Sequence, residues 1–536
     1  QKKVSMVKYF VFFMLIPAGY FILAAGKKWQ EKTDKNICLR ILSFPFGFIT
    51  ILSLFAAFLV VNLVEWVKMT CGNVSFSIIL LQLTSPIKGT DSGIINSIIK
   101  TAVVPPVLLA VAAVLCYLFI VRGMYALEDL PVKKIPRWSK ICIEVVMVVF
   151  FLHTVQVQGT EIGMWDYIQS VRERSDFYEK EYVNPAKVKM TFPKEKKNLI
   201  YIFMESMESS YADKEDGGTM DDNYIPNLTK LARENVQFTD KKDGKVGGPV
   251  CLEATAYTAG GLVAQTSAIN LKVMNSGAVS DSFLPNLTAL GDILNKQGYN
   301  QMFLCGSDGD FAGRDAYFKT HKDYQIEDYK AAIKEGDIPK DYKVYWGHED
   351  KVLYERAKKN LKKLSKEGKP FNLTMLTVDT HFPNGYICDL CENKYDTTYG
   401  NAVACADRQV YDFVQWIKKQ DFYEDTTIII AGDHTSMVDT GSKFWKSLSN
   451  DYQRTVYNAI INPQCAYKKK VTTKRKFSTM DMFPTTLAAL GVEIDGNKLG
   501  LGTNLFSGEE TLREELGANY INKELKRNDK MYNQFY

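Results

Sequence analysis

The sequence predicts an α/β protein in two parts, a bundle of about four transmembrane helices followed by a soluble domain with a mostly parallel β-sheet. Two observations support this fold class. Residues 1–156 consist of long apolar blocks separated by short basic loops, whereas residues 198–536 alternate short apolar runs with amphipathic segments. Residues 157–197 are charged, and we expect a connector helix and a tether there. With 536 residues, the chain is long enough for each part to bury a core of its own.

Four apolar stretches are candidates for membrane spans. A helix needs about 20 apolar residues to cross a bilayer core, and three of the stretches reach that length. The fourth is shorter and contains Glu144 and His153. The first lacks a small-x-small cleavage site, so we expect an anchor rather than a signal peptide. The four stretches are residues 9–26, 41–66, 101–121 and 141–156.

Loop charges predict that the soluble domain lies outside the cytoplasm. The loops after the first and the third stretch each carry five basic residues, whereas the longer loop after the second carries three. Because basic loops remain in the cytoplasm, everything after residue 157 is expected on the extracytoplasmic side of the cell membrane. The basic N-terminal segment would also lie outside. Either a further span precedes this chain, or the two interior loops decide the orientation.

The cysteines favour a disulfide over a zinc site. Cys388 and Cys391 form a C-x-x-C, and Cys405 follows closely. In an oxidising exterior, a disulfide among these three is favoured, because no nearby histidine completes a zinc ligand set. The predicted pair is Cys391–Cys405.

The soluble domain is expected to be doubly wound, with helices on both faces of the sheet. Alternation of buried strands and helices along the chain is typical of that architecture, in which ligands bind at the carboxyl ends of the strands. The predicted strands are residues 198–205, 301–306, 369–381 and 425–435, and the predicted helices are residues 225–235, 289–297 and 399–420.

Four polar residues lie at the carboxyl ends of the predicted strands: Glu205, His381, Asp433 and His434. An adjacent carboxylate and imidazole, such as Asp433 and His434, can bind one ion and suit Zn²⁺ or Mn²⁺. Taken singly, Asp433 and Glu205 could instead be helix N-caps, with His434 incidental. Three such groups at one edge of a sheet favour a metal site.

The segment GPVCLEATAYTAGG, residues 248–261, contains Thr255 and Thr258. A threonine hydroxyl is a weak nucleophile unless a bound dication lowers its pKa. Either threonine could therefore attack a substrate if it lies beside the metal site. The alternative is an ordinary helix entry, with Thr255 as the N-cap. Gly260 and Gly261 are expected to allow close packing beneath the site.

These motifs resemble those of the membrane-anchored phosphoglycerol transferases in the alkaline phosphatase and sulfatase superfamily. That family includes lipoteichoic acid synthase and the transferase that decorates periplasmic glucans, and the resemblance is closest to the glucan-decorating branch. It covers nearly the whole chain and implies a sulfatase-like α/β/α domain. Each string is weak alone, but their order and spacing are specific. The strings are NLIYIFMESMESSY, TAYTAGGLVA, FAGRDAYFKTH, LTVDTHFPNGY and GDH.

The resemblance implies roles for individual residues. The metal ligands of the family fall on Glu205, Asp433 and His434, with a nucleophilic threonine as the fourth ligand. The first threonine of the family pattern aligns with Thr255, which places Thr258 about one turn into the following helix. One divalent ion is implied, with Mn²⁺ preferred over Mg²⁺ or Zn²⁺.

Two further residues are implied on the substrate side. Arg314 occupies the basic phosphate-binding position, where a guanidinium can hold a phosphate oxygen. A surface salt bridge with Asp315 or Asp310 is the alternative for this arginine. His381 matches a histidine that can protonate a leaving oxygen or deprotonate an incoming hydroxyl.

The chain also departs from the family. A histidine of the lipoteichoic acid synthases is missing near Cys305, and a tryptophan is missing near Ala312, which puts polymerisation of that type in doubt. The long C-terminal extension of the glucan-decorating enzymes is missing too, which leaves the acceptor open. Trp346 and Asp350, in WGHED, match a local family string to which we assign no role.

The resemblance implies transfer of glycerol phosphate from phosphatidylglycerol, through a covalent threonine intermediate, to a glycan or polyol phosphate. A phosphoethanolamine transferase and an inactive membrane scaffold or glycan-binding relative are the alternatives, although the intact ligand set argues against an inactive protein. A sulfatase is disfavoured because no C-x-P-x-R string is present. No nucleic-acid partner is expected, since the net charge of +5 is mild.

Overall fold

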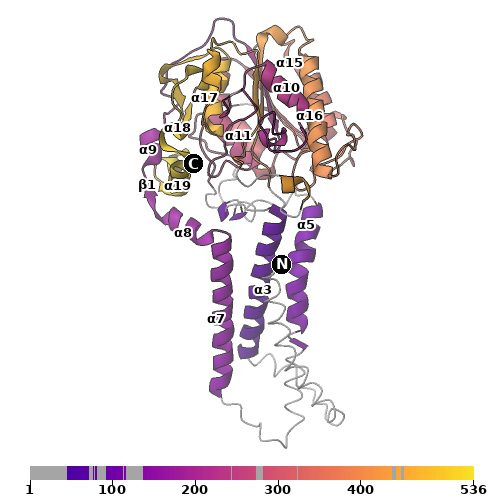
Figure 1. Cartoon of the computed structure of the whole chain (residues 1–536), viewed down its shortest axis with the longest axis vertical. Helices are drawn as coiled ribbons and strands as arrows, with labels where there is room; N and C mark the ends of the chain where they lie inside the picture. The colour runs from indigo at the N-terminus through magenta and orange to yellow at the C-terminus, as the bar shows by residue number, and fades with distance from the viewer. Residues whose placement is uncertain are drawn as a thin grey trace, which may run out of the picture. The chain divides into compact units, whose positions relative to one another are not determined.

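The computed structural model describes most of the chain after residue 137 and three helical regions before it (Figure 1). The chain divides into two compact units, residues 1–68 with 92–164 and residues 69–91 with 165–536. The described residues are 45–71, 76–77, 79–80, 92–112, 114–115, 137–242, 244–272, 282–322, 324–437, 442–447 and 452–536.

The first unit contains long apolar helices. They are α3 Pro45–Cys71, α5 Ser92–Ile98 with the π-helix η2 Ile99–Val103 and its helical continuation, and α7 Arg137–Glu161. By length and composition, Ile49–Thr70 and Gly93–Ala112 could each cross a membrane. A third span results if Val145–Glu161 and α8, Met164–Arg172, which meet at 78°, form one bent crossing. The described residues therefore contain two or three candidate spans.

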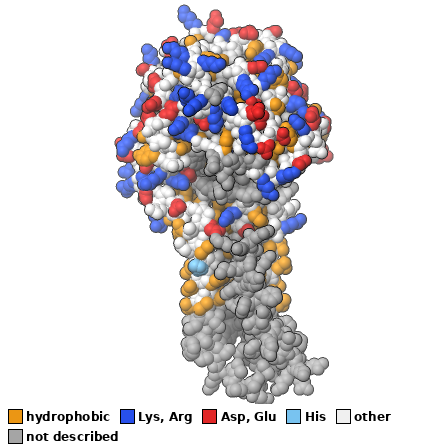
Figure 2. All heavy atoms as spheres, in the orientation of Figure 1, with side chains coloured by type: hydrophobic (Ala, Val, Ile, Leu, Met, Phe, Trp, Pro, Cys, Tyr) orange, Lys and Arg blue, Asp and Glu red, His pale blue; other side chains and the backbone are white. Residues whose placement is uncertain are grey.

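Three of the four predicted apolar stretches overlap with these helices. The stretches at 41–66 and 141–156 fall largely on α3 and α7, and the stretch at 101–121 begins later than its helix. The stretch at 9–26 lies outside the described residues. Large apolar side chains are exposed along the helices of this unit (Figure 2), with Leu108 64% and Val146 62% exposed. Such surfaces suit a lipid environment rather than water.

The second unit contains a six-stranded sheet in the order β5-β4-β6-β3-β7-β8. The first five strands are parallel and β8 is antiparallel to β7. The predicted fold class is therefore confirmed. The predicted strands correspond to β3, β4, β6 and β7, whereas the sequence pattern did not predict strands at β5 and β8. The strands are β3 Asn198–Met204, β4 Asn300–Cys305, β5 Gln325–Glu327, β6 Phe371–Leu376, β7 Thr426–Gly432 and β8 Asn458–Ile461.

Helices cover both faces of the sheet. The helices of this unit are α9 Phe177–Glu181, α10 Pro226–Glu234, α11 Thr258–Ser267, α12 Leu290–Lys296, α13 Arg314–Thr320, α14 Tyr329–Glu335, α15 Asp350–Leu364, α16 Thr398–Ile417, α17 Met482–Ala489, α18 Leu512–Leu516 and α19 Ala518–Lys526. One core contains side chains of α11, α12, α13, α17 and α19, and the other contains side chains of α10, α15 and α16. In Figure 1, α15 and α16 lie together on the right of the domain.

The side chains of β3 alternate between the two faces of the sheet, which explains why there are two cores. Its side chains point to opposite faces in turn, so Tyr201 and Phe203 enter one core while Ile202 and Met204 enter the other. All are fully buried, and each contributes roughly 1.5–3 kcal/mol of transfer free energy. A strand buried on both faces has its functional groups only at its ends. The sheet therefore presents the site at its carboxyl edge.

The region predicted as a connector is attached to the second unit by short strands. β1, Arg174–Ser175, pairs with β12, Asn528–Asp529, and β2, Met190–Thr191, pairs with β9, Glu493–Ile494. A further pair joins β10, Lys498–Leu499, to β11, Gly502–Thr503. In α9, the amide of Tyr178 donates to Asp529 at 2.9 Å. Residues 174–191 of this region thus pair and hydrogen-bond with the second unit.

Candidate active site

Two neighbouring strands end side by side at the carboxyl edge of the sheet. Glu205 directly follows β3, and Asp433 and His434 directly follow the neighbouring strand β7. All three side chains are buried, and one ligand atom from each lies within 4.8 Å of the others. His434 Nε2 is 3.3 Å from Glu205 Oε1 and 3.6 Å from Asp433 Oδ2. The structure therefore brings the three predicted metal-ligand residues together.

Hydrogen bonds fix how these side chains point. Asp433 Oδ1 accepts from the amides of Ser206 at 2.8 Å and His434 at 2.7 Å. Glu205 Oε1 accepts from the hydroxyl of Ser206 at 2.7 Å. The Nδ1 of His434 lies 2.9 Å from the carbonyl of Thr435, so its proton is held there and Nε2 faces the carboxylates.

The residues at this position fit a divalent metal ion. Asp433 Oδ2 is buried and has no hydrogen-bond partner among the described residues. A buried carboxylate oxygen without a partner is costly unless a ligand completes it. Two carboxylates and an imidazole are oxygen and nitrogen ligands that suit Mn²⁺ or Zn²⁺.

The charges of the three groups depend on one another. Burial would raise the pKa of Glu205, but the rings of His434 and His381 outweigh it and hold that pKa below its ordinary value. Burial and the charge of Glu205 raise the pKa of Asp433 to about 8. Burial would lower the pKa of His434, but Asp433 and Glu205 raise it to about 10. Binding of a dication here would displace protons.

The structure places Thr258, rather than Thr255, beside this group. Thr258 Oγ1 lies 3.2 Å from Glu205 Oε2 and 3.3 Å from His434 Nε2. Thr255 is fully buried, and its Oγ1 bonds the amide and the carbonyl of Leu252, at 2.9 and 3.0 Å. The hydroxyl of Thr255 is engaged within its own loop. This corrects the sequence-based alignment, in which Thr255 was the hydroxyl at the metal.

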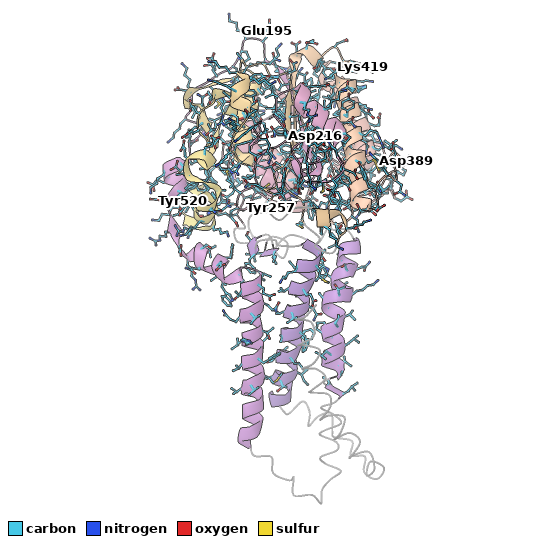
Figure 3. The ribbon with its side chains drawn as sticks, viewed as in Figure 1. Glu195, Asp216, Tyr257, Asp389, Lys419 and Tyr520 are labelled. Carbon is cyan, nitrogen blue, oxygen red and sulfur yellow. A yellow bond between two sulfur atoms is a disulfide. The ribbon has the colours of Figure 1, made fainter. Side chains whose placement is uncertain are left out.

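The path of the loop explains the difference. Ala254 has a φ of +58°, so the chain turns just before Thr255, and α11 begins only at Thr258. Figure 3 labels Tyr257, the residue directly before this helix. Close packing then sets the helix against β7, because a Cβ at Gly261 would collide with the carbonyl of Asp433. Gln265 of the same helix donates to the carbonyl of Gly432 at 2.9 Å. The helix thus presents Thr258 at its first position.

His381 lies in the loop after β6, the other neighbour of β3. Its Nδ1 is 2.8 Å from the carbonyl of Phe382, which leaves Nε2 to meet a substrate. Burial lowers the pKa of His381, and the charge of Glu205, which acts on the same ring, opposes that shift. The structure therefore brings His381 into electrostatic range of the group.

Arg314 begins α13 and is held by its own loop. Its Nε donates to the carbonyl of Phe311 at 3.0 Å, and its Nη2 donates to Ser307 Oγ at 3.0 Å and to the carbonyl of Asp308 at 2.8 Å. The guanidinium is buried, and Nη1 has no hydrogen bond with a described residue. Its charge acts on the ring of His381.

The alternative partners of this arginine are engaged elsewhere. Asp315 pairs with Lys319 at 2.7 Å, and Asp310 pairs with Lys330 at 2.5 Å. Within the described ranges, Arg314 forms no ion pair with either aspartate. A buried guanidinium without a carboxylate partner is suited to an anionic ligand.

Sequence reasoning missed the residues that hold Glu205. Thr377 Oγ1 accepts from the amide of Glu205 at 2.9 Å, and the hydroxyl of Thr380 donates to the carbonyl of Glu205. The only signal is the pairing of β3 with β6, which sets Phe203 beside Leu376 and hence Glu205 near Thr377. Strand pairing is not visible as a motif.

The structure contains a disulfide between Cys391 and Cys405, which is the pair predicted from the sequence. It joins the loop after β6 to α16. The thiol of Cys388 lies 3.6 Å from Cys391 Sγ.

Comparison with known proteins agrees with this architecture. The family model described as Sulfatase matches residues 197–492, more than half of the chain. Phosphoglycerol transferase I of Salmonella choleraesuis (strain SC-B67) is 33% identical over 340 residues, which are 61% of this chain and 41% of that protein. Phosphoglycerol transferase I of Shigella flexneri gives the same values. The chain thus matches about two fifths of the length of these relatives.

A solved membrane protein shares the fold. Lipooligosaccharide phosphoethanolamine transferase A (EptA) from Neisseria meningitidis superposes with a TM-score of 0.51 at 14% identity, covering 85% of this chain and 87% of that one. An identity this low supports the fold alone. The match to the family model, together with the sheet and its carboxyl-edge site, shows that this chain belongs to the sulfatase family.

Proposed function

We propose that the chain is a membrane-anchored phosphoglycerol transferase. It would move glycerol phosphate from phosphatidylglycerol to a hydroxyl of a cell-envelope glycan or teichoic-acid-type polyol phosphate, through a covalent intermediate on Thr258. The observation that carries the proposal is the position of Thr258 Oγ1, 3.2 Å from Glu205 and 3.3 Å from His434. The names of the 33% identical relatives support the choice of glycerol phosphate. We place the catalytic domain on the extracytoplasmic side.

The proposed site holds one divalent ion between Glu205, Asp433, His434 and Thr258, with Mn²⁺ preferred over Mg²⁺ and Zn²⁺. When bound, such an ion lowers the pKa of a coordinated hydroxyl and neutralises charge on phosphoryl oxygens. Asp433 Oδ2, which has no hydrogen-bond partner among the described residues, is available to it.

Thr258 gives up its hydroxyl proton to solvent before the first turnover. In the first step, Thr258 Oγ attacks the phosphorus as an alkoxide, and the bond to the diacylglycerol oxygen breaks. His381 Nε2 delivers a proton to that oxygen, since Nδ1 is held by the carbonyl of Phe382. The lowered pKa of His381 makes its protonated ring a stronger acid for this purpose. Arg314 holds a non-bridging phosphate oxygen through Nη1.

In the second step, an acceptor hydroxyl attacks the same phosphorus. His381 Nε2 takes the proton of that hydroxyl, and the bond to Thr258 Oγ breaks. Both residues return to their starting states, so the cycle is balanced in protons. A phosphorylated oxygen at the first position of α11 is also favoured by the amides at the helix N-terminus.

The proposal is tested by mass spectrometry of the full-length protein after incubation in lipid nanodiscs. With phosphatidylglycerol, we expect one glycerophosphoryl group on the peptide that contains Thr258. Thr258→Ala should abolish it, and the matched variant Thr255→Ala should retain it. Phosphatidylethanolamine is the second donor, and an adduct from that lipid alone would favour a phosphoethanolamine transferase. An equal adduct on Thr258→Ala would overturn the assignment of the nucleophile.

A further inference from the structure

We propose that residues 344–350, hereafter the bridging segment, position both substrate-side residues of the site, and that Asp350 is the positioning residue for His381. The inference rests on the proposed function, because it concerns how Arg314 and His381 are held for that reaction. It gives a role to the WGHED string, which the two-step mechanism does not use.

One end of the bridging segment is fastened to the loop that carries Arg314. The amide of His348 donates to the carbonyl of Gly306 at 2.8 Å, and Gly347 forms a β-bridge with Ser307. The backbones approach so closely that a Cβ at Gly347 would collide with the carbonyl of Gly306. Ser307 in turn accepts from Arg314 Nη2 at 3.0 Å. A shift of the segment would therefore move the guanidinium.

The middle of the bridging segment lies against His381. The rings of Trp346 and His381 are 4.6 Å apart, and the hydroxyl of Tyr345 donates to the carbonyl of His381. Trp346 is buried, and Phe311 of the Arg314 loop also packs against it, with the ring centroids 5.4 Å apart. One aromatic side chain thus touches both substrate-side loops.

Asp350 fixes the start of the His381 turn. Its Oδ1 accepts from the amide of Val378 at 2.7 Å and its Oδ2 from the amide of Asp379 at 3.2 Å. Asp379 Oδ1 accepts from the amide of Asp350 at 3.1 Å, so the two residues hold one another. The turn closes where the amide of His381 donates to the carbonyl of Val378 at 3.0 Å. The position of His381 therefore depends on the carboxylate of Asp350.

This arrangement is built for a carboxylate rather than for an amide. Asp350 is fully buried and is the first residue of α15, where the helix N-terminus favours negative charge. Asparagine has the same shape, but it has one acceptor and a donor that would face an amide N–H. One of the two bonds to Val378 and Asp379 would be lost. The turn would loosen without a change of volume.

The test uses the full-length protein with ¹³C-labelled histidine, followed by NMR titration. The sequence has five histidines, so His381→Gln identifies the signal of His381. Asp350→Asn should raise the pKa of His381 toward its ordinary value, because a loosened turn is less buried. Glu205, His434 and Arg314, whose charges also act on the ring, are unchanged. With phosphatidylglycerol as donor, kcat should fall about tenfold or more while KM changes little.

The matched control is Asp407→Asn, another buried aspartate that accepts from two backbone amides, but between α16 and α10. It should leave the pKa of His381 and kcat unchanged. Tyr345→Phe removes one hydrogen bond to the same loop and should raise the pKa of His381 by a smaller amount. If Asp350→Asn does not fold, the result for Tyr345→Phe decides between the outcomes. An unchanged pKa in folded Asp350→Asn would overturn the inference. The NMR readout needs no turnover, so this result is distinct from failure of the proposed function.

Discussion

At Thr255, a buried hydroxyl satisfies the backbone of its own loop. The side chain bonds both the amide and the carbonyl of Leu252. Thr255→Val keeps the shape but leaves the amide of Leu252 without that acceptor, so we expect the free energy of unfolding to fall by about 1–3 kcal/mol. Urea denaturation measures this loss. The adduct on Thr258 should persist in the variant, and loss of the adduct without loss of stability would contradict a purely structural role.

Arg314 is oriented by three hydrogen bonds that a lysine cannot reproduce. Nε and Nη2 donate hydrogen bonds to Phe311, Ser307 and Asp308, so the guanidinium group has one fixed orientation. Arg314→Lys keeps the charge but loses this geometry, and we expect kcat/KM to fall about 10- to 100-fold. Steady-state kinetics with phosphatidylglycerol measure the fall. Lys319→Arg, an exposed change on the same helix, is the control, and an equally small effect of both variants would remove Arg314 from the phosphate site.

At the scale of elements, the contact of α11 with β7 positions the nucleophile. The backbone of α11 at Gly261 approaches the carbonyl of Asp433 too closely to admit a Cβ. Gly261→Ala should therefore push the helix away from the strand and increase the distance between Thr258 and Glu205. We expect an activity loss of at least about tenfold, with destabilisation of about 1–3 kcal/mol from overpacking. Thermal unfolding and transfer assays check this.

The matched control for that variant is Gly400→Ala in α16, where the nearest atoms belong to the side chains of Tyr224 and Thr397. Those side chains can shift, so this change should retain activity. Full activity in Gly261→Ala would mean that the close approach does not position Thr258.

The junction of α16 and α10 predicts a pH dependence of stability. Asp407 of α16 accepts from the amides of Asn227 and Leu228 at the start of α10. Burial raises the pKa of Asp407 from 3.8 to about 6. Between these values the native protein binds more protons than the unfolded chain, so this group's contribution to stability decreases as the pH rises through the window.

Asp407→Asn removes this titration. Relative to the variant, the wild-type protein should lose up to about 3 kcal/mol between pH 4 and pH 7. Urea denaturation of both proteins across that range gives the difference at each pH. A difference that stays constant would show that Asp407 titrates normally.

At the scale of the whole molecule, the sheet and most of the site could be predicted because both depend on local patterns. An apolar run such as residues 198–204 is recognisable as a buried strand, and the polar residue after it must lie at the carboxyl edge. Glu205, Asp433 and His434 follow from that rule. The order of the strands, and so the support of Glu205 by Thr377, depends on pairing between distant segments.

The choice between two threonines could not be made from spacing. Both precede the glycine pair, and a family pattern aligned the first with the nucleophile. The positive φ of Ala254 and the contact of Gly261 with Asp433 decide which hydroxyl reaches the metal-ligand group, and neither is visible in the sequence. For the membrane part, hydropathy identifies apolar helices but not whether α7 and α8 form one bent span.

The proposed metal site also couples the parts of the domain, because its ligands come from the ends of β3 and β7 and the start of α11. A ligand that binds only the native protein stabilises it by an amount that grows with its concentration, about 2.7 kcal/mol at 100 times Kd.

EDTA should therefore lower the Tm of the full-length protein, and Mn²⁺ should restore it. Asp433→Asn should abolish the shift, since Oδ2 is the oxygen of this group that has no hydrogen-bond partner among the described residues, while Asp407→Asn should keep it. A Tm indifferent to EDTA and to Mn²⁺ would contradict the site. Because the shift depends on Kd, titrations with Mn²⁺, Mg²⁺ and Zn²⁺ also rank the three ions for this set of ligands.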